Sequence, residues 1–332
     1  MNSPVQVKDK MIKARTKNRI LITMGIVAAF LLGGALVPNF LKPVNLLNVV
    51  RQCSIIAICA VGIAPVIITR NTDLSIGGNV TFCGMLTGLL LLNGVPIAIA
   101  ILAALVAGVL IGLVSGSLNA FLSVPAFIAT LVVGQIAQGS AFLLNNGRSF
   151  GGFPKEYVFI GNGTLLGIPV SNYIMVLVVV IGVILTTQLP ISAWIYGLGG
   201  NEQVLRNAGV NTASIKLLVF AFSGCCAAAA GVVLAAQLDT AHPTQGEPYQ
   251  LDAIAACIMG GVSMSGGEGK IVMVMVGALV IGSIRNILNL LAVHSFYQNI
   301  LVGVIIIAVV AISMLTRLRR MQSSAQFAPA KA

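Results

Sequence analysis

Long apolar runs, separated by short polar stretches, dominate the sequence. A helix needs roughly 20 apolar residues to cross the hydrocarbon core of a bilayer, so each long run predicts a membrane segment. The segments that we expect lie at 20–38, 46–69, 75–93, 96–115, 125–144, 171–190, 215–237, 251–263, 271–291 and 297–315. Segment 251–263 is too short for a full crossing, so we expect it to be re-entrant or broken. The predicted fold class is an all-α integral membrane protein with about ten transmembrane helices.

The composition agrees with this pattern. Of the 332 residues, 58% are hydrophobic and 8% are charged, whereas soluble domains carry roughly 25% charged residues. A chain with so few charges cannot cover a water-facing surface, and we expect it to be surrounded by the lipid bilayer.

The net charge of +11 is concentrated at the two ends of the chain. Six cations precede the first segment and three follow the last: Lys8, Lys10, Lys13, Arg15, Lys17, Arg19, Arg317, Arg319 and Arg320. Such clusters mark the cytoplasmic side, so both termini are predicted to be cytoplasmic and nucleic acid is not an expected partner. The predicted organisation is a basic cytoplasmic tail at 1–19, a transmembrane domain at 20–315 and a cytoplasmic C-terminal tail at 316–332.

Two connections are long, and the alternation of segments places 145–170 outside and 191–214 inside. The inner connection predicts a short helix with Asn201 as its N-cap and Glu202 in its first turn. Gly209 is a natural stop for this helix, and Asn211 can cap the next one.

The apolar side of this short helix, at Val204, Leu205 and Ala208, has nothing in its own loop to bury it. Such a stripe is typical of a docking helix for a cytoplasmic partner, and equally of an interfacial helix that lies on lipid. The residues alone leave both readings open.

Residues Gly108, Gly112 and Gly116 recur every four residues and therefore share one helix face. Rows of small residues let two backbones approach closely in lipid. We favour packing inside one chain over the alternative, a contact face between two copies.

A faint internal repeat predicts a duplicated-half architecture. TDLSIGG at 72–78 and GSLNAFL at 116–122 parallel QLDAIAA at 250–256 and GSIRNIL at 282–288. Duplicated halves are common in transporters, where the pathway runs between them.

No enzymatic constellation is found in the sequence. His242 and His294 lie far apart, and the six cysteines show no metal-binding spacing. SMSGGEGK at 263–270 lacks the first glycine and the Ser/Thr of a nucleotide-binding loop, so we expect a glycine-rich cytoplasmic turn. No catalytic residue, metal or cofactor is expected in this chain.

Polar groups inside apolar segments are candidates for function, because charge at membrane depth is costly. Asp73 is expected to anchor the third segment with Arg70 as its partner, and Arg285 is a further intramembrane charge. A pathway for a neutral polar solute would use scattered amides and hydroxyls, and the alternative for each is an interhelical hydrogen bond. The candidates are Asp73, Ser75, Asn79, Asn119, Gln135, Gln138, Asp252, Asn286 and Asn289.

Four stretches resemble one known family, the permease subunits of bacterial ATP-binding-cassette importers for simple sugars such as ribose, xylose, arabinose and autoinducer 2. They are TDLSIGG (72–78), YGLGGNEQVLRNAGV (196–210), YQLDAIAACIMGGVSMSGGEGK (249–270) and NILNLL (286–291). The resemblance implies import of a monosaccharide or similar solute across the bacterial inner membrane. It implies as partners a cytoplasmic ATP-binding subunit that holds the ATP, a periplasmic sugar-binding protein, and a second copy or sister permease.

The resemblance also implies that 196–210 contains the helix that couples to the ATPase. The implied coupling residues are Gly199, Gly200, Asn201, Glu202, Gln203, Arg206 and Gly209. The sequence departs from the family at 203–205, where Gln-Val-Leu stands in place of Glu-Ala-Ala and Glu202 supplies an acid one position earlier.

Two alternatives remain open. One is a permease for branched-chain amino acids, which shares the architecture but does not usually carry the D-L-S-x-G stretch. The other is a stand-alone, ion-coupled secondary transporter, for which Asp73 would be the coupling acid.

Overall fold

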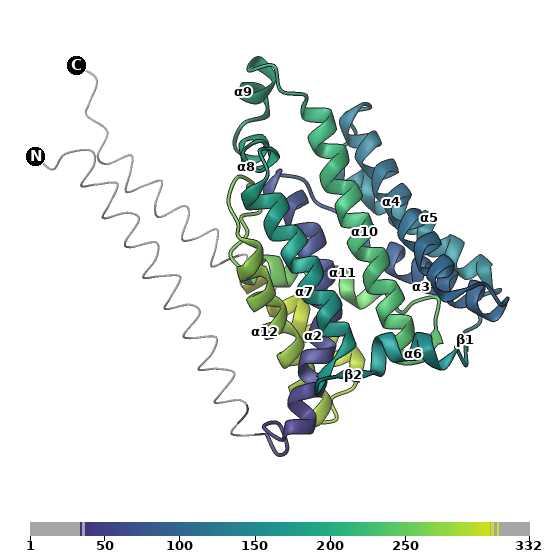
Figure 1. Ribbon diagram of the computed structural model, residues 1–332. Coiled ribbons are helices and arrows are strands. Elements are labelled where there is room, and N and C mark those ends of the chain that lie inside the picture. The colour runs from purple at the N-terminus through teal and green to yellow at the C-terminus, as the bar shows by residue number, and fades with distance from the viewer. Residues whose placement is uncertain (1–33, 35–36, 306, 309–310, 312–332) are drawn as a thin grey trace, which may run out of the picture.

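The computed structural model describes residues 34, 37–305, 307–308 and 311 of the chain. The described part is a bundle of helices with two pairs of very short strands (Figure 1). The helices are α2 (Pro43–Ile68), α3 (Ile76–Leu92), α4 (Ile97–Ala120), α5 (Ala126–Leu144), α6 (Lys155–Asn162), α7 (Val170–Val183), η1 (Ile184–Gln188), α8 (Ile191–Gly200), α9 (Glu202–Asn207), α10 (Thr212–Leu238), α11 (Glu247–Met259), α12 (Ile271–Leu290) and a last helix, Ser295–Ile305.

Six helical stretches of the described residues are long and apolar enough to cross a membrane: Pro43–Ile68, Ile97–Ala120, Ala126–Leu144, Val170–Gln188, Thr212–Leu238 and Ile271–Leu290. Each coincides with a predicted segment. The segment expected at 75–93 is α3, which has 17 residues, and the short segment expected at 251–263 is α11, which has 13. Segment 20–38 lies almost wholly outside the described residues, and 297–315 is described only in part. The count of ten helices and the duplication therefore stay predictions.

The two predicted long connections lie at opposite ends of the bundle (Figure 1). One end carries α8 and α9. The other carries α6 and the strand pairs, in which β1 (Phe150–Gly151) pairs with β4 (Thr240–Ala241) and β2 (Thr164–Leu165) pairs with β3 (Ile168–Pro169), both antiparallel. Proline precedes α4, α5, α6 and α7, where its fixed φ and missing N–H suit a helix start.

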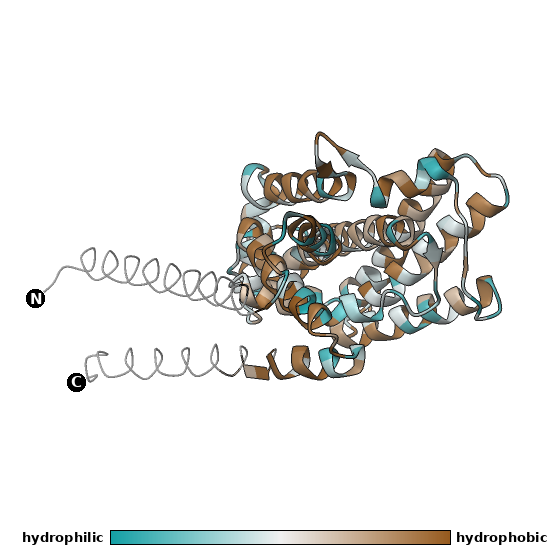
Figure 2. Cartoon of the chain, turned by 90° about the horizontal axis from the view of Figure 1, so that it is seen from below, coloured by the Kyte–Doolittle hydropathy of each residue, from teal (hydrophilic) through white to brown (hydrophobic). Residues whose placement is uncertain are grey.

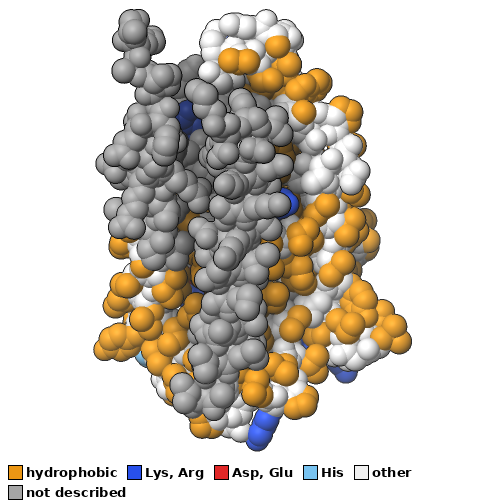
Figure 3. Space-filling view, turned by 90° about the vertical axis from the view of Figure 1, so that its left-hand side faces the viewer, with side chains coloured by type: hydrophobic (Ala, Val, Ile, Leu, Met, Phe, Trp, Pro, Cys, Tyr) orange, Lys and Arg blue, Asp and Glu red, His pale blue; other side chains and the backbone are white. Residues whose placement is uncertain are grey.

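The buried core surrounds α2 and α10, whose side chains are mostly enclosed by the other helices. The peripheral helices α4, α5 and α7 keep broad apolar faces exposed. Hydrophobic residues make up much of the helices (Figure 2), and hydrophobic side chains dominate the described part of one lateral face, where few cations interrupt them (Figure 3). Exposed apolar faces on this scale are typical of a protein whose solvent is lipid.

The glycine row of α4 packs inside the chain. A Cβ atom on Gly112 would lie 2.2 Å from the backbone oxygen of Phe220 in α10, and one on Gly224 in α10 would lie 2.1 Å from the backbone oxygen of Gly108. The absence of side chains lets the two helices touch backbone to backbone. The prediction of packing within one chain is confirmed, and the alternative of a contact face between copies is wrong for this row.

Candidate functional site

Helix α9 is an independent short helix at one end of the bundle, and its caps are those that the sequence predicts. The side-chain oxygen of Asn201 accepts hydrogen bonds from the backbone N–H groups of Gln203 (3.0 Å) and Val204 (3.3 Å). Gly209 stops the helix in a left-handed conformation with φ of 80°. The side chain of Asn211 accepts from the N–H of Ser214 (3.2 Å) at the start of α10. These bonds satisfy helix-end donors that would otherwise be unpaired.

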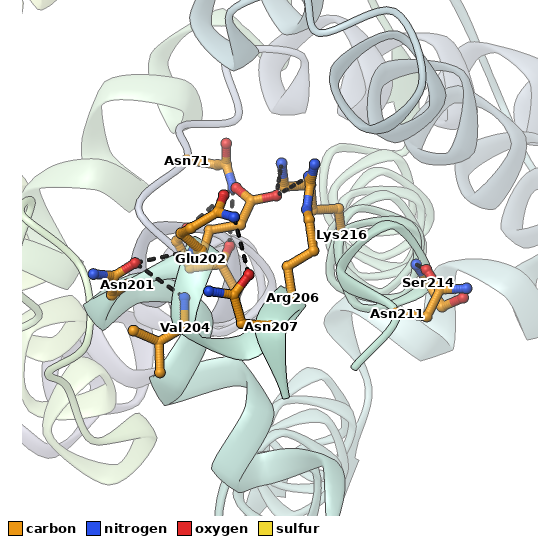
Figure 4. A network of polar contacts seen from close by, with 11 residues as sticks. Asn71, Asn201, Glu202, Val204, Arg206, Asn207, Asn211, Ser214 and Lys216 are labelled. Carbon is orange, nitrogen blue, oxygen red and sulfur yellow. Dashed lines mark hydrogen bonds and ion pairs between the residues drawn. The ribbon is translucent and has the colours of Figure 1, made fainter. Parts of the chain in front are cut away.

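Glu202 fastens α9 to α10 (Figure 4). Its Oε1 lies 2.9 Å from a guanidinium nitrogen of Arg206, in the same helix, and 3.0 Å from the Nζ of Lys216 in α10. Burial raises the pKa of Glu202, but a hydrogen bond and the positive charge of Lys216, with hydrogen bonds from Arg206 and Thr212, outweigh burial and lower the pKa. The carboxylate is therefore ionised and holds the short helix against the bundle.

The apolar side of α9 divides between the protein and its surroundings. Leu205 packs inward, and its side-chain carbons come within 3.3 Å of where a Cβ on Gly197 would lie. The expectation that this side has nothing to bury it is therefore wrong for Leu205, because α8 folds back beneath it. Val204 stays 62% exposed, and Ala208 is exposed as well. The outward face is thus a small patch that the described chain does not cover.

Asp73 is a buried anchor. Its Oδ1 accepts hydrogen bonds from the backbone N–H (2.9 Å) and hydroxyl (2.6 Å) of Ser75, and its Oδ2 accepts from the hydroxyl of Ser223 in α10 (2.6 Å). These bonds confirm the expected anchoring of α3. The expected partnership with Arg70 is wrong, because Arg70 is exposed in a left-handed conformation that turns the chain out of α2.

Asp252 has a different partner. Its Oδ1 accepts from a guanidinium nitrogen of Arg285 (2.8 Å), and Oδ2 from the Nε of the same residue, which ties α11 to α12. Arg285 also reaches the side chain of Asn299 (3.4 Å) in the last helix. Both acids singled out in the sequence therefore hold helices together, and donors occupy all four carboxylate oxygens.

The asparagine candidates mostly make helix-to-helix or local hydrogen bonds. Asn79 donates to the backbone oxygens of Gly108 (3.2 Å) and Gly224 (3.3 Å), and Asn286 exchanges two bonds with Asn45. Asn119 donates to the backbone of Val124 (3.0 Å), and Asn289 accepts from Gln298 (2.7 Å). The structure therefore shows the alternative stated from the sequence, an interhelical hydrogen bond, for Asn79, Asn286 and Asn289, whereas the bond of Asn119 is local.

Gly77 and Gly78 let two neighbours approach the start of α3. A Cβ on Gly78 would lie 2.1 Å from the backbone oxygen of Gly134 in α5, and one on Gly77 would lie 3.1 Å from the side-chain oxygen of Gln250 in α11. The start of α3 is therefore packed closely between α5 on one side and α11 on the other.

Gln135 and Gln138 in α5 and Gln250 in α11 belong to the two helices that flank the start of α3, and we call these three residues the glutamine cluster. Gln135 follows Gly134, midway along α5, and its side chain is exposed. The side chain of Gln138 is half-buried and donates to the backbone oxygen of Pro243, in the loop before α11. Gln250, also half-buried, lies against Gly77. Amides that stay accessible midway along a membrane helix favour a polar pathway over lipid.

The comparisons with known proteins bear on what this arrangement does. The family of the permease component of the branched-chain amino acid transport system matches residues 45–310. The chain belongs to this family of membrane permeases.

Curated relatives of the permease are import proteins. It is 38% identical over 312 residues to the ribose import permease of Haemophilus influenzae, covering 93% of this chain and 95% of that protein. It is 37% identical to the D-allose transport system permease of Escherichia coli (87% and 89% covered). It is 32% identical to the autoinducer 2 import system permease of Shigella flexneri (90% and 88% covered). No solved structure matches the chain. The resemblance to importer permeases for simple sugars is confirmed.

Gln250 and the loop 242–246 were not among the candidates from the sequence. The loop enters the bundle: the N–H of Gly246 donates to the hydroxyl of Thr81 in α3 (3.0 Å), and the side chain of Gln245 lies against Gly84. A Pro-Thr-Gln-Gly stretch just before a helix that is too short to span was the available signal, because polar backbone at membrane depth must be buried in protein or line a cavity.

Proposed function

We propose that this permease is the membrane subunit of an importer that carries a monosaccharide or a similar neutral polar solute into a bacterial cytoplasm. A separate ATP-binding subunit supplies the energy and holds the ATP, and a periplasmic binding protein delivers the solute. The permease functions in the inner membrane as a pair, with a second copy or a sister subunit, and both of its termini are cytoplasmic.

The observation that carries this proposal is α9. It is a six-residue helix that is capped at its start, fastened to α10 through Glu202 and Lys216, and placed beyond the end of the spanning helices with Val204 facing outward. A helix held so firmly while burying so little of its own surface suits a rigid contact for another protein better than a mobile loop.

The glutamine cluster supports a neutral solute. Amide side chains donate to and accept from hydroxyl groups without introducing a charge that would repel or trap the solute. The side chains of Gln135, Gln138 and Gln250 come from two helices on either side of the start of α3, so a shift of either helix would alter their spacing. Alternating access then consists of rearranging these contacts when the ATPase draws together the α9 helices of the two paired permease subunits.

The ion-coupled alternative has less support. A coupling acid must take up and release an ion, yet Asp73 and Asp252 are buried with their oxygens occupied by Ser75, Ser223 and Arg285. The amino-acid alternative is an outcome of the test below.

Uptake measurements test the proposal. In a strain lacking this gene and its neighbours in the transport system, we expect labelled pentoses or hexoses to enter only when the permease, the ATPase and the binding protein are all restored. Uptake of leucine or valine instead would point to the amino-acid alternative. Uptake that needs no ATPase and collapses with a protonophore would identify a secondary transporter and overturn the proposal.

A further inference from the structure

Three segments that are distant in the sequence meet at the base of α9, and we call their meeting point the glycine junction. It consists of Ile68 at the end of α2, Gly199 at the end of α8, and Gly267 in the turn 263–270 between α11 and α12. The expected glycine-rich turn therefore lies at the same end of the bundle as α9.

The contacts at the junction are between backbones. The N–H of Gly267 donates to the backbone oxygen of Ile68 (2.8 Å). A Cβ on Gly199 would lie 1.8 Å from that same oxygen and 2.4 Å from the nitrogen of Gly267, so only glycine fits at position 199. A Cβ on Gly266 would lie 2.7 Å from the backbone oxygen of Gly199. Nearby, the hydroxyl of Tyr196 in α8 donates to the backbone oxygen of Gly269 (2.9 Å).

Backbone contact makes the junction stiff. A side chain between two segments can change rotamer and absorb a displacement, whereas packed backbones transmit it. The turn adopts this path because Gly261, Gly266 and Gly267 have φ values of 76°, 77° and 72°, which other residues rarely adopt.

Two segments of the junction lead toward the glutamine cluster, and the third leads to α9. Beyond Ile68 the chain turns at Arg70 and runs through Asp73 to the start of α3, which lies between α5 and α11. Before the turn 263–270 lies α11, which carries Gln250. Gly199 is separated from α9 only by Gly200 and the cap Asn201.

We propose that the glycine junction transmits displacement of α9 to α3 and α11, and so to both sides of the glutamine cluster. Gly199, which is buried, and Tyr196, which is half-buried, are positioning residues in this scheme: they couple the movement of the ATPase to the opening for the solute. The inference rests on the proposed function and assigns the route within the chain by which that function operates.

The test separates coupling from assembly. The permease is reconstituted in vesicles with its ATPase and binding protein, and both solute uptake and ATP hydrolysis are measured for Gly199→Ala, Tyr196→Phe and a control, Gly303→Ala. Among the residues that the structure describes, no atom lies within 4 Å of a Cβ on Gly303, in the last helix, so the control adds the same methyl group without a described neighbour.

For Gly199→Ala we expect copurification of the ATPase to persist while the solute carried per ATP hydrolysed falls about tenfold. Tyr196→Phe should lower this ratio about two- to threefold, and Gly303→Ala should leave it unchanged. If Gly199→Ala does not fold, the coupling ratio of Tyr196→Phe, which removes only one hydroxyl, tests the junction by itself. Coupling ratios equal to the control in every folded variant would overturn the junction but not the proposed function. Failure of the unaltered permease to bind the ATPase would overturn the proposed function itself.

Discussion

At the scale of single residues, burial and hydrogen-bond partners decide which polar groups can meet a solute. Asp73, Asn79, Asp252 and Asn286 are buried, and each has partners in neighbouring helices. Gln135 is the candidate from the sequence that stays exposed midway along a spanning helix. A sequence records residue type at membrane depth, but the number of satisfied donors and acceptors around a residue depends on helices that are distant in the chain.

The ionised state of Glu202 leads to a residue-scale prediction. Its partners lower its pKa below the ordinary value of 4.5, so its stabilisation of α9 is complete above that pH and is lost as the pH falls through the lower, folded-state value. We expect the hydrogen-exchange protection of the α9 amides to fall about two- to fivefold across that acidic range, the size of effect typical of a partly exposed ion pair.

The matched variant for this measurement is Glu202→Gln, which keeps the shape but not the charge. Its protection should already be reduced at neutral pH and should show little further change on acidification. An equal dependence on pH in both proteins would show that another group is responsible.

At the scale of elements, the start, end and apolar face of most helices follow from local chemistry. Prolines precede four helices, Asn201 and Asn211 cap two more, and the small residues of α4 line one face. The partner of that face, α10, lies about a hundred residues further along the chain, so its identity needed the fold.

The contact between α4 and α10 predicts a large effect of one added methyl group. Gly112→Ala would place a carbon 2.2 Å from the backbone oxygen of Phe220, which cannot move aside as a side-chain tip can. We expect a loss of about 2 kcal/mol in the free energy of unfolding, as for other overpacked sites, measured by thermal or denaturant unfolding in detergent.

Gly139→Ala in α5 is the control, because no atom of the described residues lies within 4 Å of the added carbon. That variant should be as stable as the unaltered protein or slightly more stable, since alanine favours a helix. Unchanged stability in Gly112→Ala would mean that α4 and α10 pack less tightly than the structure shows.

At the scale of the whole molecule, the permease has two dissimilar ends. One presents α9 with Val204 outward, and the other presents the β2–β3 pair, whose turn residue Leu166 is 90% exposed (Figure 1). Through Gly199 and Gly267, the first end is connected by backbone contacts to α2 and to the turn between α11 and α12. This asymmetry fits energy input at one face and solute entry at the other.

A pair of matched charge substitutions tests the assignment of the ends. Val204→Glu should reduce copurification with the ATPase about tenfold, because it buries an unpaired charge at the centre of the proposed contact. Leu166→Glu, an equivalent change at the opposite end, should leave copurification unchanged. Equal recovery of the ATPase with both variants would remove α9 from the docking surface.

The sequence by itself determined the membrane class, the positions of the spanning helices, the shortness of α11 and the capped helix α9. These properties depend on hydrophobicity and helix-end chemistry, which act within a few turns of chain. The tertiary structure alone decided that Asp73 bonds to Ser223, that Leu205 turns inward, and that Ile68, Gly199 and Gly267 meet beneath α9. Each of these is a contact between segments far apart in the chain. Where two backbones come this close, the sequence shows only that a glycine is present. It does not show which segment that glycine contacts.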